Sequence, residues 1–431
     1  MKTVNIVNLG CAKNIVDSEF LARQLELNGY KTVYDKDTYH PFTLINTCGF
    51  IHDAQEESVD TILEAIRFKN EHPDAFVGVF GCLTGLFKKE LEKEIPEVDA
   101  WFGKFDIEQI MGTLNGVLHE SHRHERIMST PNHYAYLKIA EGCNRKCAFC
   151  SIPKITGNYT SVPLPELIKQ TQDLAKKGVK ELLLIAQDLT LYGTDLPEKP
   201  TLTDLIRAIS QVNSIEWIRL HYAYPVGIPD DLFEEMRTNP KVCRYLDIPI
   251  QHINDEILSA MKRGHNREVT RQLISDLRTQ VPDVALRTTL IVGFPNETDE
   301  QFNELLAYIE EARFEKMGAF PYSHEQYTPA YEALEDTVDE DIKQQRLDTL
   351  MEAQHAISQE LTLQKIGQEL KVIIDREEDG VYYGRSEFDS PEVDGEIQIE
   401  TTSPLEIGTF CTVKITDADA YDLIGEVISL H

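Results

Sequence analysis

The sequence predicts an α/β protein of three parts. Strands and helices alternate through residues 1–118, which indicates an N-terminal parallel α/β domain. Six further strand-and-helix units in residues 134–364 favour a central partial (β/α)6 barrel. Short alternating runs in residues 365–431 predict a small C-terminal antiparallel β-barrel. Residues 119–133, between the first two domains, have the composition of a linker.

The first domain is expected to contain three strands and three helices. Its first strand is residues 2–10. Asn14 is the expected N-cap of a helix that continues to about Leu27 and ends at Gly29. The later elements are the strands 43–46 and 76–80 and two helices, 54–68 and one that begins after Gly85. This βαβα order predicts one parallel sheet with helices on its faces.

In the central domain, short buried strands are expected to alternate with helices. The strands are residues 136–140, 181–186, 217–221, 245–250, 285–292 and 316–323. The helices are residues 165–177, 202–212, 229–237, 255–261, 267–279 and 298–311, followed by a long charged helix, 339–363. Thr298 and Gln301 form a capping-box pattern, which defines one helix start. Six units are too few for a closed eight-stranded barrel, so an open barrel is expected.

The chain is strongly acidic. It has 73 Asp and Glu against 42 Lys and Arg, a formal net charge of −31. This charge repels nucleic-acid phosphates and favours a basic partner, although acidity can equally serve solubility alone. From Ile366 onward there are 16 Asp and Glu against 4 Lys and Arg. Nucleic-acid binding by a small barrel needs positive charge, so a basic protein is the better expected partner.

The sequence contains no apolar run of about 18 residues or more, which excludes a membrane-spanning helix. The stretch before Cys11 is too short and too polar for a signal sequence. A cytoplasmic location without membrane attachment is therefore expected. In a reducing compartment the eight cysteines are expected to be free thiols or metal ligands and not disulfides.

Three cysteines carry the strongest functional signal. Cys143, Cys147 and Cys150 form a C-x3-C-x2-C pattern directly after the first strand of the central domain. Three thiolates on one loop can bind three irons of a 4Fe-4S cluster and leave the fourth iron open. A zinc site or three structural cysteines are the alternatives. Zinc prefers four ligands in paired spacings, and no fourth ligand stands at such a spacing.

Cys11, Cys48 and Cys82 form a second set, because each directly follows a candidate parallel strand. The carboxyl ends of parallel strands meet at one edge of a sheet, where ligands bind. The three thiols could converge on one cluster, but buried cysteine is also a common core residue, and the spacing leaves both interpretations open. Cys243 and Cys411 lie within strand patterns and are expected in the core.

Two strand ends of the central domain are candidates for cofactor contacts. Gln187 follows the second strand and Gly293 follows the fifth, and catalytic contacts in α/β barrels gather at such ends. Gly293 would let the backbone approach a nucleoside closely. Ordinary turns explain both segments equally well. The histidines form no metal-binding pattern, and His252 is expected to be a hydrogen-bonded residue at the edge of the sheet.

Three sequence blocks resemble the radical S-adenosylmethionine (SAM) methylthiotransferase family, and the resemblance covers essentially the whole chain. The blocks are LGCAKNIVDSE (9–19), EGCNRKCAFCSIPKITG (141–157) and VGFPNETDEQF (292–302). The resemblance implies an N-terminal methylthiotransferase domain, a radical-SAM domain and a C-terminal TRAM barrel. It also implies SAM and two 4Fe-4S clusters. The implied ligands are Cys143, Cys147 and Cys150 for the radical cluster and Cys11, Cys48 and Cys82 for an auxiliary cluster.

Two branches of that family modify different substrates. One modifies an aspartate of small-subunit ribosomal protein number twelve, and the other modifies isopentenyl-adenosine in tRNA. Gly10-Cys11-Ala12-Lys13-Asn14 stands here where the tRNA branch usually has Gly-Cys-Gln-Met-Asn. The segments PYSHEQYTPAY (321–331) and GRSEFDSPEVDG (384–395) are also similar to the ribosomal-protein branch. The implied function is methylthio transfer to the aspartate β-carbon, with tRNA modification as the nearest alternative.

The resemblance also implies a reaction and its partners. A 5′-deoxyadenosyl radical from SAM removes hydrogen from the β-carbon, the auxiliary cluster supplies sulfur, and a second SAM supplies the methyl group. The implied partners are the ribosomal protein, free or in its subunit, and an electron donor such as flavodoxin or ferredoxin, while direct tRNA binding is not expected. A non-catalytic iron–sulfur sensor or electron carrier is the alternative from another class. Thr156, Asn158, Tyr159 and Thr160 stand where relatives tend to carry arginines, which puts any anion contact made there in doubt.

Overall fold

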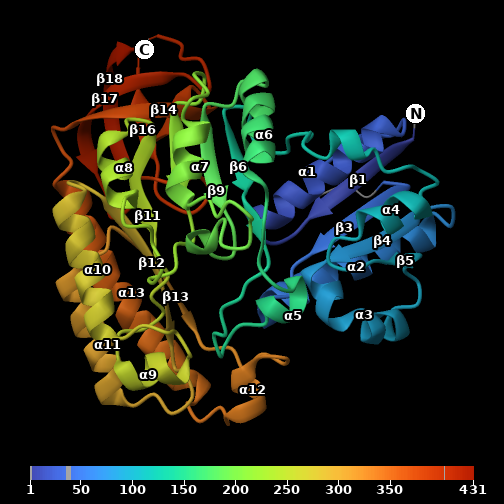
Figure 1. Cartoon of the computed structure of the whole chain (residues 1–431), viewed down its shortest axis with the longest axis horizontal. Helices are drawn as coiled ribbons and strands as arrows, with labels where there is room; N and C mark the ends of the chain where they lie inside the picture. Colours follow the sequence, from blue (N-terminus) through green and yellow to red (C-terminus); the bar gives the residue numbers. More distant parts are fainter. Residues whose placement is uncertain (1, 35–39, 402) are drawn as a thin grey trace.

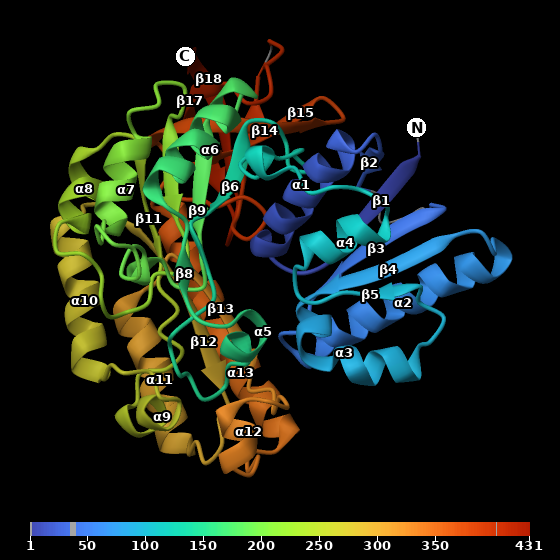
Figure 2. The same cartoon turned by 45° about the vertical axis from the view of Figure 1, so that its right-hand side comes forward.

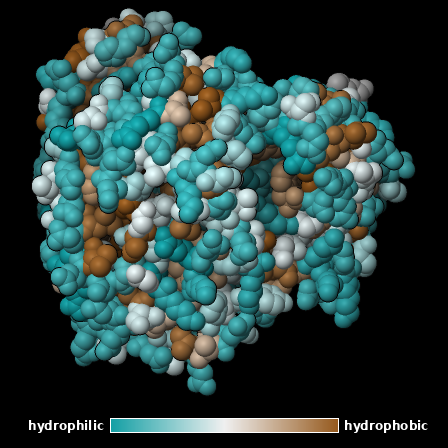
Figure 3. Space-filling model, in the orientation of Figure 1, coloured by the Kyte–Doolittle hydropathy of each residue, from teal (hydrophilic) through white to brown (hydrophobic). Residues whose placement is uncertain are grey.

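The computed structural model describes residues 2–34, 40–401 and 403–431, and Figure 1 shows three sheet-containing parts in chain order. The N-terminal part lies beside the central part, and the C-terminal barrel lies at the end of the central sheet that is remote from the helix α5 (Ile152–Thr156) (Figures 1 and 2). Within the described residues, no helix is both long enough and apolar enough to cross a membrane. Most side chains on the face shown in Figure 3 are hydrophilic, as expected from the many charged residues.

The N-terminal domain contains one parallel sheet in the order β2-β1-β3-β4-β5, which confirms the predicted topology. Its strands are β1 (Thr3–Asn8), β2 (Lys31–Val33), β3 (Phe42–Thr47), β4 (Phe76–Gly81) and β5 (Ala100–Trp101). Its helices are α1 (Ala12–Leu27), α2 (His52–Glu71), α3 (Cys82–Glu94) and α4 (Ile107–Thr113). Leu21 of α1 and Ile110 of α4 pack on one face of the sheet, and Ile62 of α2 packs on the other. The strands β2 and β5 and the helix α4 are too short to produce a periodic signal, so the sequence did not reveal them.

The start of α1 differs from the expectation. The helix begins at Ala12 with Cys11 as its N-cap, so the prediction that Asn14 caps it is wrong. The buried amide of Asn14 instead donates hydrogen bonds to the carbonyls of Leu9 (3.0 Å) and Thr47 (3.1 Å). Asn14 thereby joins the carboxyl ends of β1 and β3, where two of the candidate ligands follow.

The central domain contains a six-stranded, all-parallel sheet in the order β13-β12-β11-β10-β9-β6. Its strands are β6 (Tyr134–Lys138), β9 (Glu181–Ile185), β10 (Trp217–Leu220), β11 (Val242–Asp247), β12 (Ala285–Val292) and β13 (Lys316–Pro321). Its longer helices are α6 (Leu164–Lys176), α7 (Leu202–Ile209), α8 (Leu232–Thr238), α9 (Asp255–Ala260), α10 (Arg267–Gln280), α11 (Asp299–Ala312) and α13 (Glu340–Leu363). The capping box of Thr298 and Gln301 is present at the start of α11. Because β6 and β13 are the two edges of the sheet, the predicted partial (β/α)6 barrel is confirmed.

The C-terminal domain is a closed five-stranded barrel. Its strands are β14 (Glu369–Glu378), β15 (Val381–Ser386), β16 (Ile397–Glu400), β17 (Phe410–Ala418) and β18 (Leu423–Leu430). Four of the five strand pairs are antiparallel, as expected, and β16 pairs with β18 in parallel. Cys411 is buried in the barrel, and Cys243 is buried where the barrel meets the central domain, so both are core residues as expected.

Buried ion pairs attach the C-terminal barrel to the central sheet. Glu181, the first residue of β9, accepts hydrogen bonds from Arg219 Nε (2.7 Å) and Arg385 Nη2 (2.8 Å). Arg219 belongs to β10 and Arg385 to β15, and all three side chains are buried. Three strands from two domains therefore meet at one carboxylate.

The loop between β15 and β16, residues 387–396, joins the two edges of the open barrel. Glu392 accepts hydrogen bonds from the hydroxyls of Tyr134 and Tyr136 on β6 (3.0 Å each). Asp389 forms an ion pair with Lys316 on β13 (2.8 Å). The two edge strands are therefore connected through the C-terminal domain.

Candidate functional site

The loop that carries the first three-cysteine set is bracketed by a short hairpin, in which β7 (Ala140–Glu141) pairs antiparallel with β8 (Thr160–Ser161). The chain between these strands carries α5 and the three cysteines of the predicted radical cluster, Cys143, Cys147 and Cys150. The Cys143 N–H donates to the Gly157 carbonyl at 3.2 Å, which helps to close the loop. Local chain geometry therefore brings the three thiols to one place after β6.

A glycine is required directly before the first of these cysteines. Gly142 has a φ of +82°, and a Cβ atom at this position would overlap the Asn158 carbonyl oxygen. Gly157, on the far side of the loop, also has a positive φ (+75°), but open space surrounds the place of its Cβ. The close approach at Gly142 thus keeps the two ends of the loop together.

Arg145, inside the cysteine motif, anchors the loop to the central sheet. Its Nε forms an ion pair with Asp188 (2.8 Å), and its Nη2 donates to the Val226 carbonyl (2.9 Å). Its guanidinium lies 3.9 Å from the centroid of the Tyr224 ring. Asp188 is buried and follows β9, one of the strand ends at which the sequence predicts cofactor contacts.

A second arginine contacts a thiol directly. Arg263 Nη1 donates to Cys147 Sγ at 3.2 Å, and its guanidinium lies 4.2 Å from the Tyr224 ring. Arg263 therefore places a cationic donor beside one of the three candidate ligands. Burial raises the pKa of the Cys150 thiol to about 12, so iron binding there must release a proton.

The second three-cysteine set lies at the carboxyl ends of three neighbouring strands, as the sequence predicts. Cys11 follows β1, Cys48 follows β3, and Cys82 follows β4. Cys82 is the first residue of α3, so the expected helix start after Gly85 is wrong: the helix begins directly at the strand end. A Cβ atom on Gly10 would lie 3.0 Å from Cys48 Cβ, which shows how closely the segments around Cys11 and Cys48 approach.

The thiols of the second set lie near one another. Burial raises the pKa of Cys82 to about 12; the Lys104 ammonium opposes this rise, and Cys11 and Cys48 add to it. Cys11 is exposed and Cys48 half-buried, so the set opens toward the molecular surface. Within the described residues, no three His, Cys, Asp or Glu side chains are grouped so that they could hold a single metal ion. Ligands to separate irons of a cluster lie farther apart than ligands to one ion.

A charged cluster joins the two cysteine sets. Lys104 Nζ forms ion pairs with Asp17 (3.0 Å) and Glu141 (2.8 Å), and Lys138 pairs with the same two carboxylates. Burial alone would raise the pKa of Glu141, but Lys138 and Lys104 outweigh it and hold this pKa well below its usual range. Asp17 and Lys104 belong to the N-terminal domain, and Glu141 directly precedes the cysteine loop. The cluster therefore connects the domain that carries the second cysteine set to the segment that leads into the loop of the first set.

A second contact between the domains lies on the other side of the cysteines. Figure 2 shows α3 beside α5, and a Cβ atom on Gly85 of α3 would lie 3.2 Å from Ile155 Cγ2 of α5. Glu325, near the end of β13, accepts hydrogen bonds from the His52 N–H (2.8 Å) and from Gln55 Nε2 (3.0 Å). Contacts on two sides thus fix the N-terminal domain over the mouth of the barrel.

The two predicted SAM contacts have different surroundings. Gln187 Nε2 donates to Glu141 Oε1 at 2.7 Å, whereas Gln187 Oε1 is buried without a hydrogen-bond partner among the described residues. An acceptor of this kind fits a ligand that carries a donor. Gly293 has a φ of +73°, and a Cβ atom there would overlap the side chain of Lys343 on α13. The side chain that approaches Gly293 closely is therefore that of a lysine. Gln187 and Gly293 both stay predictions as SAM contacts.

Sequence reasoning missed four side chains that border the cysteines: Lys13, Arg145, Tyr222 and Arg263. Arg145 stands inside the cysteine motif and Lys13 two positions after Cys11, so their place in the sequence could have indicated them. Tyr222 and Arg263 reach the site from distant parts of the chain. Only the folded chain brings them there: Tyr222 follows β10, and Arg263 follows α9 in the connection between β11 and β12.

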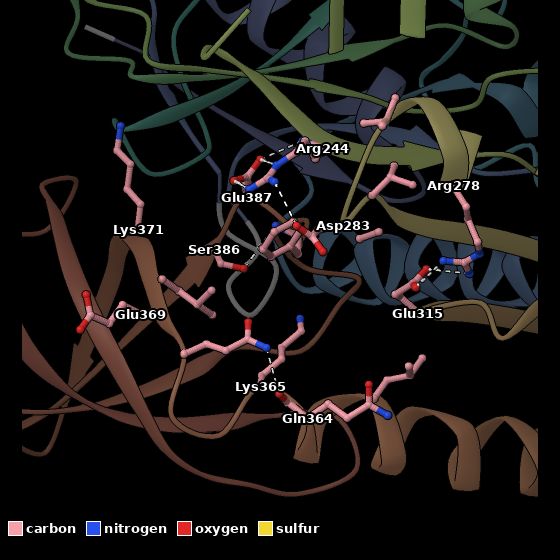
Figure 4. Close-up of a pocket in the computed structure, with 17 residues that line it drawn as sticks. Arg244, Arg278, Asp283, Glu315, Gln364, Lys365, Glu369, Lys371, Ser386 and Glu387 are labelled. Carbon is pink, nitrogen blue, oxygen red and sulfur yellow. Dashed lines mark hydrogen bonds and ion pairs between the residues drawn. The ribbon is translucent and has the colours of Figure 1, made fainter. Parts of the chain in front are cut away.

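A cavity of about 780 Å³ lies far from the cysteines, between the central sheet and the C-terminal barrel. Figure 4 shows Arg244 paired with Glu387 and Arg278 paired with Glu315 in its wall. Arg244 lies near the amino end of β11 and Glu315 directly precedes β13, whereas catalytic groups of α/β barrels gather at the carboxyl ends. The cavity is thus a gap between domains and not the candidate site.

Comparison with known proteins defines the class. Residues 137–309 match the Radical SAM superfamily, residues 366–428 the TRAM domain, and residues 3–103 the Uncharacterized protein family UPF0004. An open parallel barrel with a three-cysteine loop after its first strand agrees with the first match. The chain belongs to the radical SAM superfamily, and this membership implies a 4Fe-4S cluster and SAM.

Solved structures agree on the fold. The radical S-adenosylmethionine methyltransferase TsrM from Kitasatospora setae superimposes with a TM-score of 0.55 at 16% identity, over 76% of this chain and 77% of that chain. The cobalamin-dependent S-adenosylmethionine radical enzyme OxsB gives a TM-score of 0.51 at 13% identity, over 83% of this chain and 56% of that chain. At these identities the likeness concerns the fold alone.

Curated relatives identify the family within the superfamily. Relatives from Phocaeicola vulgatus and Bacteroides thetaiotaomicron are 49% and 48% identical, over 99% and 100% of this chain and 99% of each relative. A relative from Parabacteroides distasonis is 47% identical over 99% of both chains. All three are named ribosomal protein uS12 methylthiotransferase RimO. The chain belongs to this methylthiotransferase family.

Proposed function

We propose that this protein transfers a methylthio group to the β-carbon of an aspartate in ribosomal protein uS12. The observation that carries the proposal is the pair of three-cysteine sets, one on each domain, which one cluster of ion pairs joins. Methylthio transfer to carbon needs both activation of a C–H bond and a source of sulfur, and two separate cofactor sites meet these two needs. The names of the full-length relatives support uS12 as the substrate.

The loop of the central domain is the proposed site of the radical cluster. Its ligands are Cys143, Cys147 and Cys150. A 4Fe-4S cluster held there would, together with SAM, supply the radical that abstracts hydrogen from an unactivated carbon. Three thiols from one loop, with the Arg263 guanidinium at Cys147, suit a cluster of negative charge. Gln187, through its unpartnered buried oxygen, and Gly293 are the proposed SAM contacts.

The edge of the N-terminal sheet is the proposed site of the auxiliary 4Fe-4S cluster, which supplies sulfur. Its ligands are Cys11, Cys48 and Cys82. A second SAM supplies the methyl group. The chain itself positions the groups: Arg145 and Asp188 fix the radical loop, and the ion pair of Lys104 with Glu141 joins the two domains that carry the sites.

Charge supports a protein substrate over tRNA. The net charge of −31 favours a basic ribosomal protein and opposes a polyanion. The proposed units are residues 1–118 for the auxiliary cluster, 134–364 for radical chemistry and 365–431 for the TRAM barrel, with 119–133 as linker. Action on a ribosomal protein places the enzyme in the cytoplasm, and reduction of its cluster calls for a donor such as flavodoxin or ferredoxin.

Anaerobic reconstitution tests the proposal. Protein loaded with iron and sulfide is incubated with dithionite, SAM and uS12, and the products are analysed by mass spectrometry. We expect 5′-deoxyadenosine together with a methylthio mass on one aspartyl peptide. Formation of neither product would leave only an iron–sulfur sensor or carrier, and a methylthio group on tRNA instead of uS12 would favour the other branch.

Cysteine variants separate the two sites. Cys143→Ala should abolish 5′-deoxyadenosine formation, because the radical cluster loses a ligand. Cys48→Ala should still form 5′-deoxyadenosine but yield no methylthio product, because the sulfur source is lost. Cys411→Ala, a matched change of a core thiol in the C-terminal barrel, should retain both activities. Equal effects of all three changes would contradict the assignment.

A further inference from the structure

Lys13 extends from the N-terminal domain toward the mouth of the central barrel. It lies in the first turn of α1, two positions after Cys11, and its Nζ is 4.2 Å from the ring centroid of Tyr222. Tyr222 follows β10, so its ring lies at the carboxyl end of the central sheet. Lys13 is also close enough to Cys82 and Glu141 for their charges to act on it. One ammonium group therefore lies both beside the auxiliary cysteines and at the barrel mouth.

The ammonium of Lys13 lacks an acceptor. It forms no hydrogen bond or ion pair within residues 2–34, 40–401 and 403–431, although the side chain is half-buried. The neighbouring carboxylates, Asp17 and Glu141, are already shared by Lys104 and Lys138. An ammonium carries three hydrogen-bond donors, and none of those of Lys13 is used by an acceptor of the described residues. The position therefore suits an incoming anion.

Tyr222, the aromatic support of Lys13, has an unusual backbone conformation. Its φ is +62°, in the left-handed region that bulky residues rarely adopt. Its N–H donates to Asp247 Oδ2 (3.2 Å), and its carbonyl accepts from the Leu189 N–H (3.2 Å). Strained residues of this kind persist where neighbours hold them, and they concentrate at ligand sites. The sheet thus holds the ring rigidly in the place where it contacts Lys13.

We propose that Lys13, supported by Tyr222, binds the side-chain carboxylate of the substrate aspartate. The inference rests on the proposed function and deepens it. The reacting β-carbon is bonded directly to the carboxylate carbon, so an ammonium that holds the carboxylate also positions the β-carbon. That carbon must meet both the sulfur source and the radical. Lys13 lies beside the cysteines of the proposed sulfur source, and its charge interacts with Glu141, two positions before the loop of the proposed radical cluster. Lys13 is a substrate-binding residue in this assignment.

An ammonium at this place has one competing role, which is to balance the negative charge of a cluster on Cys11, Cys48 and Cys82. That role would appear in the iron content and in the electron paramagnetic resonance (EPR) spectrum of the auxiliary cluster. It would not distinguish a substrate aspartate from an asparagine. The two roles therefore predict different measurements.

A double-mutant cycle measures the coupling between Lys13 and the carboxylate. Reconstituted wild-type enzyme and Lys13→Met are titrated anaerobically, with SAM and without reductant, against uS12 and against uS12 whose target aspartate is replaced by asparagine. Wild type should bind the aspartate form at least about tenfold more tightly, because the charge-assisted hydrogen bonds are lost with asparagine. Lys13→Met should bind both forms with similar affinity.

Two further variants serve as controls. Lys13→Arg keeps a cation at the site and should retain part of the preference for aspartate. Lys31→Met makes the same change at an exposed lysine of the same domain and should retain all of it. An unchanged preference in Lys13→Met would overturn the inference, and so would loss of iron or an altered EPR spectrum in that variant. If the proposed function itself were wrong, the result would be different: the wild-type enzyme would bind the aspartate and asparagine forms of uS12 equally and would form no methylthio product.

Discussion

Gly142 and Gly157 both have a positive φ, but they have different roles in the cysteine loop. Gly142→Ala should distort the loop, because the added Cβ meets the Asn158 carbonyl and the backbone cannot yield cheaply. We expect this variant to lose most of the radical-cluster iron on reconstitution, as measured by Mössbauer spectroscopy. Gly157→Ala adds only the unfavourable φ, about 1 kcal/mol, and should retain its iron. Equal iron loss in the two variants would show that conformational strain, and not the close approach, decides the outcome.

His252 is the residue that most clearly links pH to stability. It is buried, and its Nδ1 accepts a hydrogen bond from the Asn254 N–H (3.0 Å), which confirms the expected hydrogen bonding. Burial and, to a smaller extent, the Arg346 charge together lower its pKa to about 3. The unfolded chain binds this proton near pH 6.5, so between about pH 6.5 and 3 the unfolded state holds more protons and stability falls as pH falls.

The midpoint of thermal unfolding should therefore decrease between pH 7 and pH 5. His252→Asn can still accept the Asn254 hydrogen bond through Oδ1 but carries no ionisable group, so part of this decrease should vanish. His72→Asn, at an exposed histidine, should keep the full pH dependence of wild type. Identical pH profiles for all three proteins would contradict the assignment of a neutral buried histidine.

At the scale of elements, the attachment of the C-terminal barrel depends on buried charge. Glu181→Gln removes the carboxylate shared by Arg219 and Arg385; Arg385 keeps its ion pair with Asp375, but Arg219 keeps no carboxylate partner among the described residues. Loss of one partner of a buried ion pair costs about 3–5 kcal/mol. Hydrogen exchange of β15, followed by mass spectrometry, should accelerate strongly in this variant.

An exposed pair between the same two domains provides the control. Glu216 and Lys371 are 2.9 Å apart, with side chains 40% and 44% exposed. Glu216→Gln should change stability by less than about 1 kcal/mol, because water screens the pair. Comparable acceleration of exchange in Glu216→Gln and Glu181→Gln would refute the importance of burial.

Helices and strands with clear local patterns were predictable from the sequence. Element boundaries were not predictable where a polar side chain forms hydrogen bonds to a distant segment instead of a local cap. The six strands of the central barrel and the capping box at Thr298 follow from alternating apolar runs and a local cap motif. The start of α1 did not, because Asn14 uses its amide to join β1 and β3, a contact between segments far apart in sequence. Gly293 shows the same limit: the sequence predicted a close approach to a nucleoside, but the close neighbour in the structure, Lys343, comes from a distant helix.

At the scale of the whole molecule, the candidate site was predictable only where it is local. Cys143 and its two partners stand in one loop, so their spacing alone indicated a cluster. Cys11 and its partners were indicated by their positions after strands, since parallel strands end at one edge. The charged cluster at Lys104 and the contact of Lys13 with Tyr222 exist only because two domains meet, and no spacing within either domain contains that information.

The net charge of −31 should shape how the enzyme finds a basic substrate. We expect the association rate with uS12 to fall as ionic strength rises from about 0.05 to 0.3 M, because the screening length shortens. Replacing exposed acids of the C-terminal barrel, Glu400→Lys with Glu406→Lys, should slow association further if this barrel faces uS12. The same change of net charge on the N-terminal domain, Glu71→Lys with Glu94→Lys, should have the smaller effect. Stopped-flow measurements with equal slowing in both double variants would count against a docking role for the barrel.

The loop 387–396 connects the two edges of the open central barrel, since it contacts Tyr134 and Tyr136 on one edge strand and Lys316 on the other. Deletion of the C-terminal domain would remove these contacts and leave the side chains at both edges of the central barrel without their partners. Loss of activity in such a truncated enzyme would then reflect a distorted central barrel and would give no information about substrate binding. Charge-reversal substitutions on the outer surface of the C-terminal barrel leave these contacts intact. They are therefore the better way to determine what this domain contributes.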